Sequence, residues 1–214
     1  MAVEAVIWDF GGVFTTSPFE AFNRYEAERG LPRDFIRRVN ATDPDTNAWA
    51  RFERAEIDPA AFDALFLAES TALGHPVRGR DVLPLLSGDV RPKVVAALDA
   101  CRARFKVGCI TNNVQTGAGA GMAGTAEKAA VVAAIMARFH HVMESSKVGI
   151  RKPDPRIYAL MCEALDVDPR ACVYLDDLGV NLKPARAMGM ATIKAETEAQ
   201  MLGELAALTG LPVG

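Results

Sequence analysis

The chain has 214 residues, half of them apolar, and a formal net charge of −3, which fits one large domain or a core with a smaller insert. This charge balance provides no broad basic field, so we expect no nucleic-acid partner. No apolar run approaches the roughly 18 residues that span a bilayer, so we expect no membrane partner. Four cysteines without C-x-x-C spacing, and an N-terminus without a signal-peptide pattern, predict a cytoplasmic protein with reduced thiols.

Strand and helix patterns alternate along the chain in the order typical of a parallel sheet. A β-favouring apolar run at residues 3–9 predicts the first strand, and residues 18–88 show helical periodicity with no convincing strand. Beyond them we expect helices at residues 92–105, 128–138, 155–165, 182–188 and 196–208, and strands at residues 106–111, 142–144, 171–175 and 191–194. The predicted fold class is α/β: a doubly wound parallel sheet in a core of residues 1–16 and 89–214, with a small helical cap of residues 17–88 inserted after the first strand.

A glycine-rich stretch at residues 115–125 interrupts this alternation. It holds four glycines in eleven residues, a composition that favours a flexible connection over a helix. No Gly-Lys-Ser or Gly-Lys-Thr ends it, so it does not match a phosphate-binding P-loop. We expect a flexible connection, with a lid beside the site as the alternative.

Asp9 is the first candidate functional residue. It follows an apolar run at residues 5–8, so it lies where a buried parallel strand ends, at the edge of the sheet where ligands bind. Gly11 and Gly12 come next and let the backbone approach a ligand closely, with amides aimed at an anion. A carboxylate in this position could serve as a nucleophile, a metal ligand or both. The alternative is an aspartate that caps a turn.

Two later segments carry polar groups that could bind an anion. Thr111, Asn112 and Asn113 end the second predicted strand, so the Thr111 hydroxyl and the amides of the turn could hold phosphate oxygens near the end of the first strand. Lys152 precedes Pro153 in a rigid turn, from which its amine could point at the same anion. The alternatives are an ordinary Thr-Asn-Asn turn and a surface lysine.

Two adjacent acids, Asp176 and Asp177, follow the strand predicted at residues 171–175. Adjacent carboxylates repel each other, and a cation relieves that repulsion. Hard oxygen ligands select Mg²⁺, so the sequence predicts a Mg²⁺ cofactor here. The alternative, a pair of solvated loop acids, fits poorly after a buried strand.

Taken in order, these four segments resemble the motifs of the haloacid dehalogenase-like (HAD) hydrolase superfamily. That family has a nucleophilic aspartate after the first strand, a serine or threonine after the second, a lysine before a helix, and acids after the fourth. The resemblance covers the whole chain, and the helical insert matches the family's cap in position and length. Residues 147–153 and the long stretch 175–190 are similar to the branch that contains the phosphatase domain of soluble epoxide hydrolase.

The resemblance implies a mechanism for each matching residue. Asp9 would attack a phosphoryl group and form an aspartyl-phosphate that water then hydrolyses. Mg²⁺ would be held by Asp9, the Gly11 backbone carbonyl and Asp177, and would offset charge on the transferring group. Thr111 would hydrogen-bond a phosphoryl oxygen, and Lys152 would pair with the phosphate and with Asp9.

The same resemblance implies supporting roles for other residues. Asp176 would support the metal site, and Asn181 stands where many relatives carry another acid. Lys147 is a weaker rival of Lys152, because no proline follows it. The predicted substrate contacts are Gly12, Asn112, Asn113, Trp49 and Arg51.

One departure from the family pattern is Gly11, which stands where its phosphatases usually have a second aspartate that protonates the leaving group. Loss of a positioned acid–base typically removes roughly 10²–10⁴ in rate, yet the sequence Asp-Phe-Gly-Gly-Val resembles a variant of this branch that includes phosphatases. The predicted function is a Mg²⁺-dependent phosphatase that hydrolyses a small phosphate ester. The alternatives are a haloacid dehalogenase, and a catalytically weak protein that binds a phosphometabolite or a partner. The acids Asp176 and Asp177 argue against the dehalogenase, because they would repel a carboxylate substrate.

The cap should select the substrate. Phe14, Phe19, Trp49, Arg51 and Phe52 are candidates to line the entrance, and Trp49 and Arg51 could stack on and pair with a substrate. The alternative is that these side chains only pack a helical bundle. An exposed apolar face of the cap could support a homodimer.

Overall fold

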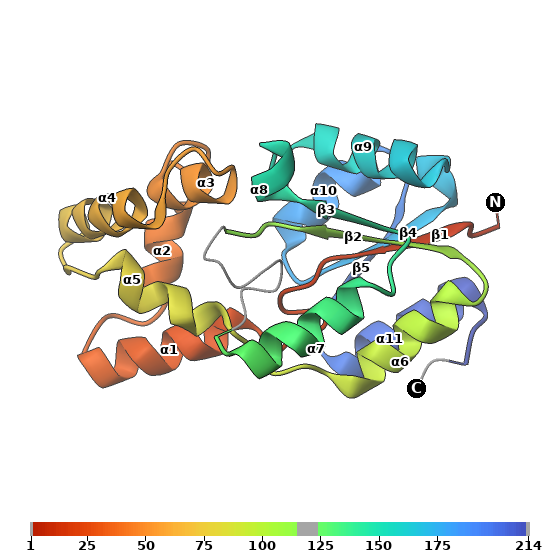
Figure 1. The fold of residues 1–214 in the computed structure, drawn as a ribbon, viewed down its shortest axis with the longest axis horizontal. Coiled ribbons are helices and arrows are strands. Elements are labelled where there is room, and N and C mark those ends of the chain that lie inside the picture. The colour runs from red at the N-terminus through yellow and green to blue at the C-terminus, as the bar shows by residue number, and fades with distance from the viewer. Residues whose placement is uncertain (1, 115–123, 213–214) are drawn as a thin grey trace.

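Five parallel strands form one sheet in the computed structural model, which describes residues 2–114 and 124–212 (Figure 1). The strands lie in the order β3-β2-β1-β4-β5. Their bounds are Ala5–Trp8 for β1, Lys106–Thr111 for β2, His141–Glu144 for β3, Cys172–Asp176 for β4 and Ala191–Lys194 for β5. The doubly wound α/β fold predicted from the sequence is therefore confirmed.

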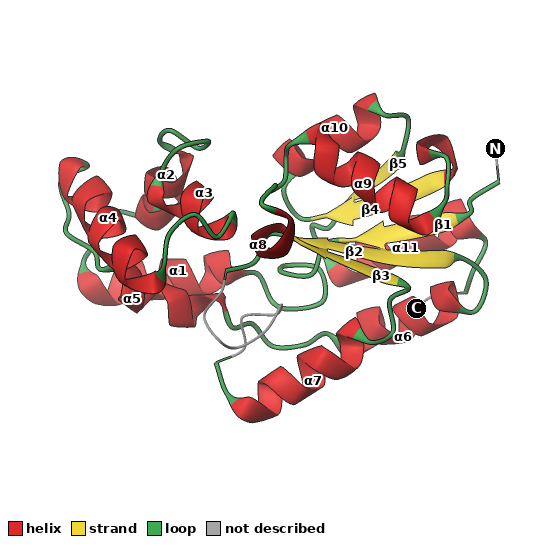
Figure 2. Cartoon of the chain, turned by 45° about the horizontal axis from the view of Figure 1, so that its top comes forward, coloured by secondary structure: helices red, strands yellow, loops and turns green. Residues whose placement is uncertain are grey.

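Helices cover both faces of this sheet (Figure 2). One face packs against α6 (Pro92–Arg102), α7 (Ala126–Met136) and α11 (Glu198–Thr209), and the other against α9 (Pro155–Leu165) and α10 (Gly179–Ala187). Alternation along β1 explains both layers, because successive side chains of a strand point to opposite faces. Val6 and Trp8 belong to the apolar cluster on the face covered by α6, α7 and α11. Ala5 and Ile7 belong to the cluster on the face covered by α9 and α10.

The insert between β1 and β2 is helical along its length and faces the carboxyl ends of the strands (Figure 1). Its elements are α1 (Pro18–Arg29), α2 (Phe35–Ala41), α3 (Ala48–Glu53), α4 (Pro59–Ala72), α5 (Gly79–Val82) and a 3₁₀ turn η1 (Leu83–Leu86). It has an apolar cluster of its own, centred on Phe52, Phe62 and Phe66. Asp58 accepts a hydrogen bond from the Ala61 amide and starts α4, as a helix N-cap does.

The two connections between the insert and the sheet domain run side by side. Thr15 and Val90 form an antiparallel bridge, and the Thr16 amide donates to the Asp89 carbonyl at 2.9 Å. This pairing joins the insert to the core through two hydrogen-bonded segments. The domain boundaries at residues 16 and 89 remain a prediction: residues 1–16 and 89–214 form the core, and residues 17–88 the cap.

Element bounds differ from those predicted in a few places. The α8 turn (Ser145–Val148) and the 3₁₀ turn η2 (Pro169–Ala171) were not expected, because elements this short leave little periodicity to detect. Helix α10 starts at Gly179, earlier than predicted, since glycine and asparagine in its first turn are weak helix formers. Most of the glycine-rich stretch, residues 115–123, lies outside the described residues.

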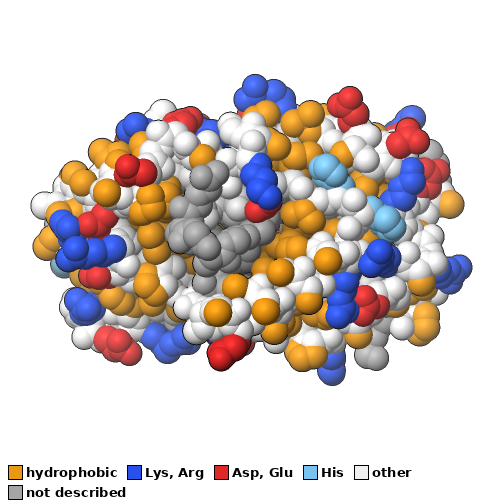
Figure 3. Space-filling view, viewed as in Figure 1, with side chains coloured by type: hydrophobic (Ala, Val, Ile, Leu, Met, Phe, Trp, Pro, Cys, Tyr) orange, Lys and Arg blue, Asp and Glu red, His pale blue; other side chains and the backbone are white. Residues whose placement is uncertain are grey.

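The surface carries both signs of charge. Figure 3 shows basic and acidic side chains interspersed over one face, with neither sign gathered into a continuous area among the coloured residues. Within the described part of the chain, no helix is long and apolar enough to cross a membrane.

Candidate active site

The site lies at the carboxyl ends of the central strands. β1 pairs with β2 on one side and with β4 on the other, with Trp8 opposite both Cys109 and Leu175. Residues that follow β1 therefore meet those that end β2 and β4. In an open parallel sheet this point, where the strand order reverses, is where ligands bind.

Lys152 forms the centre of the charged cluster. Its side chain is 1% exposed, and its amine contacts Asp9 Oδ1 at 2.7 Å and Asp176 Oδ2 at 2.8 Å. Burial alone would lower the pKa of Lys152, but the carboxylates of Asp176 and Asp9 outweigh it and hold the pKa above its ordinary value. Lys147, the weaker rival for this role, is instead a 71% exposed side chain paired with Glu144 at the surface.

Asp176 is held from several sides. Besides the Lys152 amine, it accepts hydrogen bonds from the Tyr174 hydroxyl at 2.6 Å, the Leu178 amide at 2.8 Å and the Asn181 side-chain amide at 3.0 Å. Both of its oxygens are occupied by these donors. Asp176 is therefore placed to orient Lys152, and Asn181 to orient Asp176.

Three carboxylates converge beside Lys152. Oxygens of Asp9, Asp176 and Asp177 lie within 4.8 Å of one another. Burial raises the pKa of Asp177 to about 7, and the Asp176 charge adds to that rise. Burial also raises the pKa of Asp9 well above its ordinary value; the Lys152 amine opposes this, while the Asp176 and Asp177 charges add to it. Three acids against one lysine leave excess negative charge that a divalent cation would offset.

The chemistry of these groups fits a cation such as Mg²⁺. Because Asp176 is saturated by donors, Asp9 and Asp177 are the two carboxylates of the cluster best able to bind an ion. Gly12 lets its backbone approach Asp177 closely: a Cβ there would overlap Asp177 Oδ2, and its φ is +74°. Only glycine accommodates both conditions without strain.

A cavity of about 320 Å³ opens above this cluster, between core and cap. Polar groups of the core line its floor: Asp9, Thr111, Lys152 and Asp177. Its walls are largely apolar and come mainly from the cap: Pro18, Phe19, Phe22, Trp49, Leu86 and Val180. Phe19 and Trp49 thus lie in the cavity wall, as predicted from the sequence.

Three other candidates for the cavity entrance lie elsewhere. Arg51 is outside the cavity lining, with a 41% exposed side chain 3.9 Å from Glu56. Phe14 is buried among the aromatic rings of the core, and Phe52 stacks on Phe62 inside the cap. The entrance role predicted for these three residues was therefore wrong. For Arg51 the reason is helical geometry, since residues two apart do not share a face.

The side chains of the two asparagines after β2 form hydrogen bonds with other groups of the protein. Asn112 lines the cavity, but its side chain accepts from the Lys152 amide at 2.8 Å and donates to the Lys152 carbonyl at 3.0 Å. Asn113 is buried, and its side-chain amide binds Glu144 and Ser146. The Asn113 side chain is thus occupied by protein groups, and its backbone amide donates to the Ser145 hydroxyl at 3.0 Å. The substrate contact predicted for Asn113 stays a prediction.

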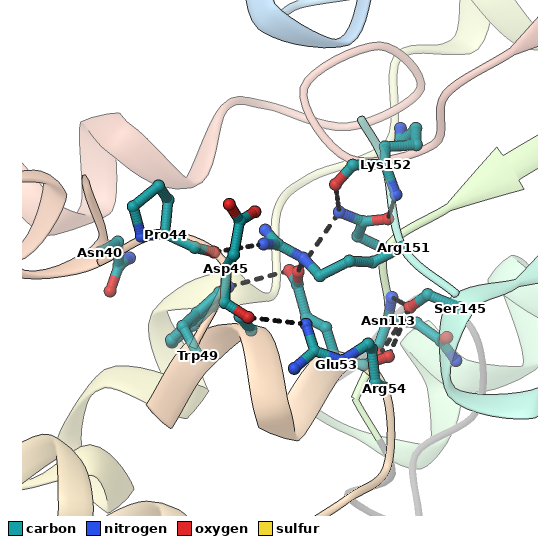
Figure 4. Close-up of polar contacts among 12 residues, drawn as sticks. Asn40, Pro44, Asp45, Trp49, Glu53, Arg54, Asn113, Ser145, Arg151 and Lys152 are labelled. Atoms are coloured by element: carbon teal, nitrogen blue, oxygen red, sulfur yellow. Dashed lines mark hydrogen bonds and ion pairs between the residues drawn. The ribbon is translucent and has the colours of Figure 1, made fainter. Parts of the chain in front are cut away.

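Sequence reasoning missed three charged residues of the cavity wall, Arg37, Glu53 and Arg151. The last two are partners. They form an ion pair of 2.6 Å between the cap helix α3 and the turn before Lys152 (Figure 4). Glu53 also accepts from the Trp49 indole N–H at 2.8 Å. The spacing of Trp49 and Glu53, four residues apart on one helix face, is the signal that could have found the glutamate.

Comparison with known proteins identifies the family. A family model described as haloacid dehalogenase-like hydrolase matches residues 3–189. The chain belongs to the haloacid dehalogenase-like hydrolase family. It is therefore a hydrolase, and the family resemblance drawn from its motifs is confirmed.

Several relatives are similar over nearly the whole chain. Acyl-CoA dehydrogenase family member 10 of Mus musculus is 32% identical over 98% of this chain, and bifunctional epoxide hydrolase 2 of Sus scrofa is 29% identical over 99% of it. The chain spans only 19% and 40% of these two proteins. A phosphatase of Mycobacterium tuberculosis is 31% identical over 89% of this chain, which spans 86% of that relative.

Solved structures show the same fold. A HAD family enzyme of Bacteroides thetaiotaomicron, in complex with magnesium and inorganic phosphate, aligns with a TM-score of 0.60 at 18% identity, over 92% of this chain and 96% of that one. L-2-haloacid dehalogenase of Xanthobacter autotrophicus aligns with a TM-score of 0.60 at 16% identity, over 99% and 84% of the two chains. At such identities the likeness establishes the fold alone.

Proposed function

We propose that this hydrolase is a Mg²⁺-dependent phosphatase that acts on a small phosphorylated metabolite through an aspartyl-phosphate on Asp9. The observation that carries the proposal is the buried Asp9–Lys152 pair, 2.7 Å apart, on the floor of the cavity beside Asp177. The similarity to a mycobacterial phosphatase of nearly the same extent supports it.

Asp9 is oriented before a substrate arrives. The Lys152 amine and the Phe10 amide both bind its Oδ1 atom, at 2.7 and 2.6 Å. In the first step a carboxylate oxygen attacks phosphorus as the bond to the ester oxygen breaks, and the leaving alkoxide takes a proton from water to give the alcohol. Water then attacks phosphorus and releases inorganic phosphate and the Asp9 carboxylate. Thr111 and Lys152 would hold phosphoryl oxygens during both steps.

Mg²⁺ would be held by Asp9, Asp177 and the Gly11 carbonyl. When bound, it supplies positive charge that offsets the charge of the transferring group. The protein's part is to keep Asp9 and Asp177 close together and to keep Asp176 turned toward Lys152. A cation here would also offset the charge of Asp9 and Asp177, two neighbouring acids whose pKa values are raised.

The cavity walls suggest which esters fit. Their apolar side chains, Phe19, Phe22 and Trp49 among them, suit a substrate whose organic part is largely apolar. The Arg37 guanidinium lies 4.3 Å from the centre of the Phe19 ring and places one positive charge on the same wall. We therefore expect preference for compact esters with an apolar body over polyhydroxylated sugar phosphates.

Phosphate release from an aryl phosphate and from panels of lipid and sugar phosphates tests the proposal. We expect turnover with Mg²⁺ and background rates with chelator, because the acid cluster repels phosphate when no cation is bound. Aryl phosphates should react faster than alkyl esters, since Gly11 provides no acid for the leaving group. No turnover on any substrate, with Mg²⁺ still bound, would favour a phosphometabolite-binding protein instead.

Replacing Gly12 with alanine should weaken Mg²⁺ binding by about tenfold or more, because the new Cβ would displace Asp177. Calorimetric titration with Mg²⁺ measures the effect. Gly30→Ala is the matched control: Gly30 has a similar φ of +65°, but nothing lies within 4 Å of its added Cβ. Equal Mg²⁺ affinity in Gly12→Ala and Gly30→Ala would show that Asp177 does not bind the ion.

A further inference from the structure

The cap and the core meet at one polar cluster, which we call the cap–core contact: Glu53, Arg151, Asn112 and Ser145. Glu53 is a cap residue whose side chain is 9% exposed. Arg151, from the core, donates through Nε to Glu53 and through a terminal nitrogen to the Pro44 carbonyl of the cap at 2.8 Å. Figure 4 shows Arg151 reaching between Pro44 and Glu53, next to Lys152.

The Glu53 carboxylate is also connected to Lys152, through hydrogen bonds made by one residue, Asn112. Its Oε2 atom accepts from the Asn112 side-chain amide at 3.2 Å. The same Asn112 side chain holds both polar groups of the Lys152 backbone, accepting from its N–H at 2.8 Å and donating to its C=O at 3.0 Å. Lys152 in turn places its amine 2.7 Å from Asp9. A short chain of hydrogen bonds therefore links the cap to the proposed nucleophile.

The backbone of Glu53 makes a separate connection. The Ser145 hydroxyl donates to the Glu53 carbonyl at 2.7 Å and accepts from the Asn113 amide at 3.0 Å. This contact does not involve the Glu53 carboxylate. A change confined to the carboxylate should therefore leave the cap docked on the core.

Glu53 is, with Asp9 and Asp177, one of three carboxylates in the described lining of the cavity, so it is a candidate for the acid missing at Gly11. Its hydrogen bonds argue against that role. Trp49 donates to one oxygen, and Arg151 and Asn112 donate to the other. A carboxylate whose two oxygens both accept hydrogen bonds from N–H groups is suited to be an ionised acceptor and not a proton donor.

We infer that Glu53 is a positioning residue: through Asn112 it fixes the backbone of Lys152, so that docking of the cap sets the geometry of the Lys152–Asp9 pair. The effect on turnover rests on the proposed phosphatase function. The hydrogen-bond link from Glu53 through Asn112 to Lys152 does not rest on that function, because it concerns only contacts within the protein. Small misplacements of a catalytic group are costly, since a shift of about 1 Å can reduce the rate roughly 10²-fold.

The first experiment measures the link without activity, by hydrogen–deuterium exchange of the full chain. In Glu53→Gln the Lys152 amide, now bound to a less restrained Asn112, should exchange about tenfold faster or more. Glu56→Gln is the matched control, because it breaks an ion pair of the same 2.6 Å length, to Arg54, that stays inside the cap. Unchanged exchange at Lys152 in Glu53→Gln would overturn the inference, whatever the enzyme's activity.

The second experiment measures kcat and KM on an aryl phosphate. Glu53→Gln should lower kcat by about 10–100-fold, and Glu56→Gln should leave it unchanged. If Glu53 acts through Asn112, the double variant Glu53→Gln/Asn112→Ala loses no more kcat than Asn112→Ala alone. Additive losses, or loss of one limb of the kcat pH profile in Glu53→Gln alone, would overturn the positioning role. Faster exchange in Glu53→Gln, where the wild-type protein shows no turnover, would uphold the link and reject the phosphatase proposal.

Discussion

Asp9→Asn is expected to reduce phosphate release by roughly 10⁴-fold or more, because an amide oxygen is too weak a nucleophile to form the acyl-phosphate intermediate. The substitution preserves shape, and the Phe10 amide, 2.6 Å away, can still donate to the side-chain oxygen. The loss should therefore appear in kcat while the fold is retained. Single-turnover measurement of phosphate release with Mg²⁺ tests it.

The same variant should be more stable than the wild type at neutral pH without metal, because the Lys152 amine keeps its contact with Asp176 and the cluster loses one of its three carboxylates. Burial raises the pKa of Asp9 in the folded state, so ionising it costs stability as the pH rises above about 4. Asparagine stays neutral and avoids that cost, so its advantage in melting temperature should grow from pH 4 to pH 7. A lower melting temperature at pH 7, or turnover within tenfold of the wild type, would contradict the role given to Asp9.

The residues at the centre of the candidate site could be predicted because parallel strands end at a common edge of the sheet. Asp9, Thr111 and Asp176 each end or follow an apolar run, and the strand order places those runs side by side. Local sequence is enough to find such residues, since a buried strand rarely ends in a carboxylate without a partner. Lys152 comes from a turn instead, and resemblance to the family's motif was needed to select it over Lys147.

The cap side of the site was predicted only in part. Trp49 and Glu53 are four residues apart in α3 and share the cavity face, whereas Arg51 lies between them and faces away. Arg51 was predicted because it is close to Trp49 in the sequence, but helical spacing places Glu53 on the same face as Trp49. The partner of Glu53 could not be foreseen, because Arg151 lies 98 positions along the chain and no local pattern specifies that contact.

Lys152→Met is expected to abolish turnover and to destabilise the fold by about 3–5 kcal/mol at neutral pH, the usual effect of removing one partner from a buried ion pair. Methionine fills a similar volume but leaves the carboxylates of Asp9 and Asp176 without the amine that contacts both. The pKa of Lys152 is raised in the folded state, so the stabilisation that it provides is present at all pH values below about 10. Urea unfolding measures the loss.

The stability of Lys152→Met should recover when the excess negative charge of the carboxylate cluster is removed. Because burial raises the pKa of Asp177 to about 7 and that of Asp9 above its ordinary value, lowering the pH from 8 to 5 protonates acids that now lack a counter-charge. The free energy of unfolding of Lys152→Met should therefore rise toward that of the wild type over this range, and Mg²⁺ at pH 8 should have the same effect. Lys147→Met is the control, since the Lys147 amine is at the surface and Glu144 keeps the hydrogen bond from the Asn113 side-chain amide, so the loss should be within about 1 kcal/mol. Equal losses in the two variants would mean that the buried amine does not hold the carboxylate cluster together.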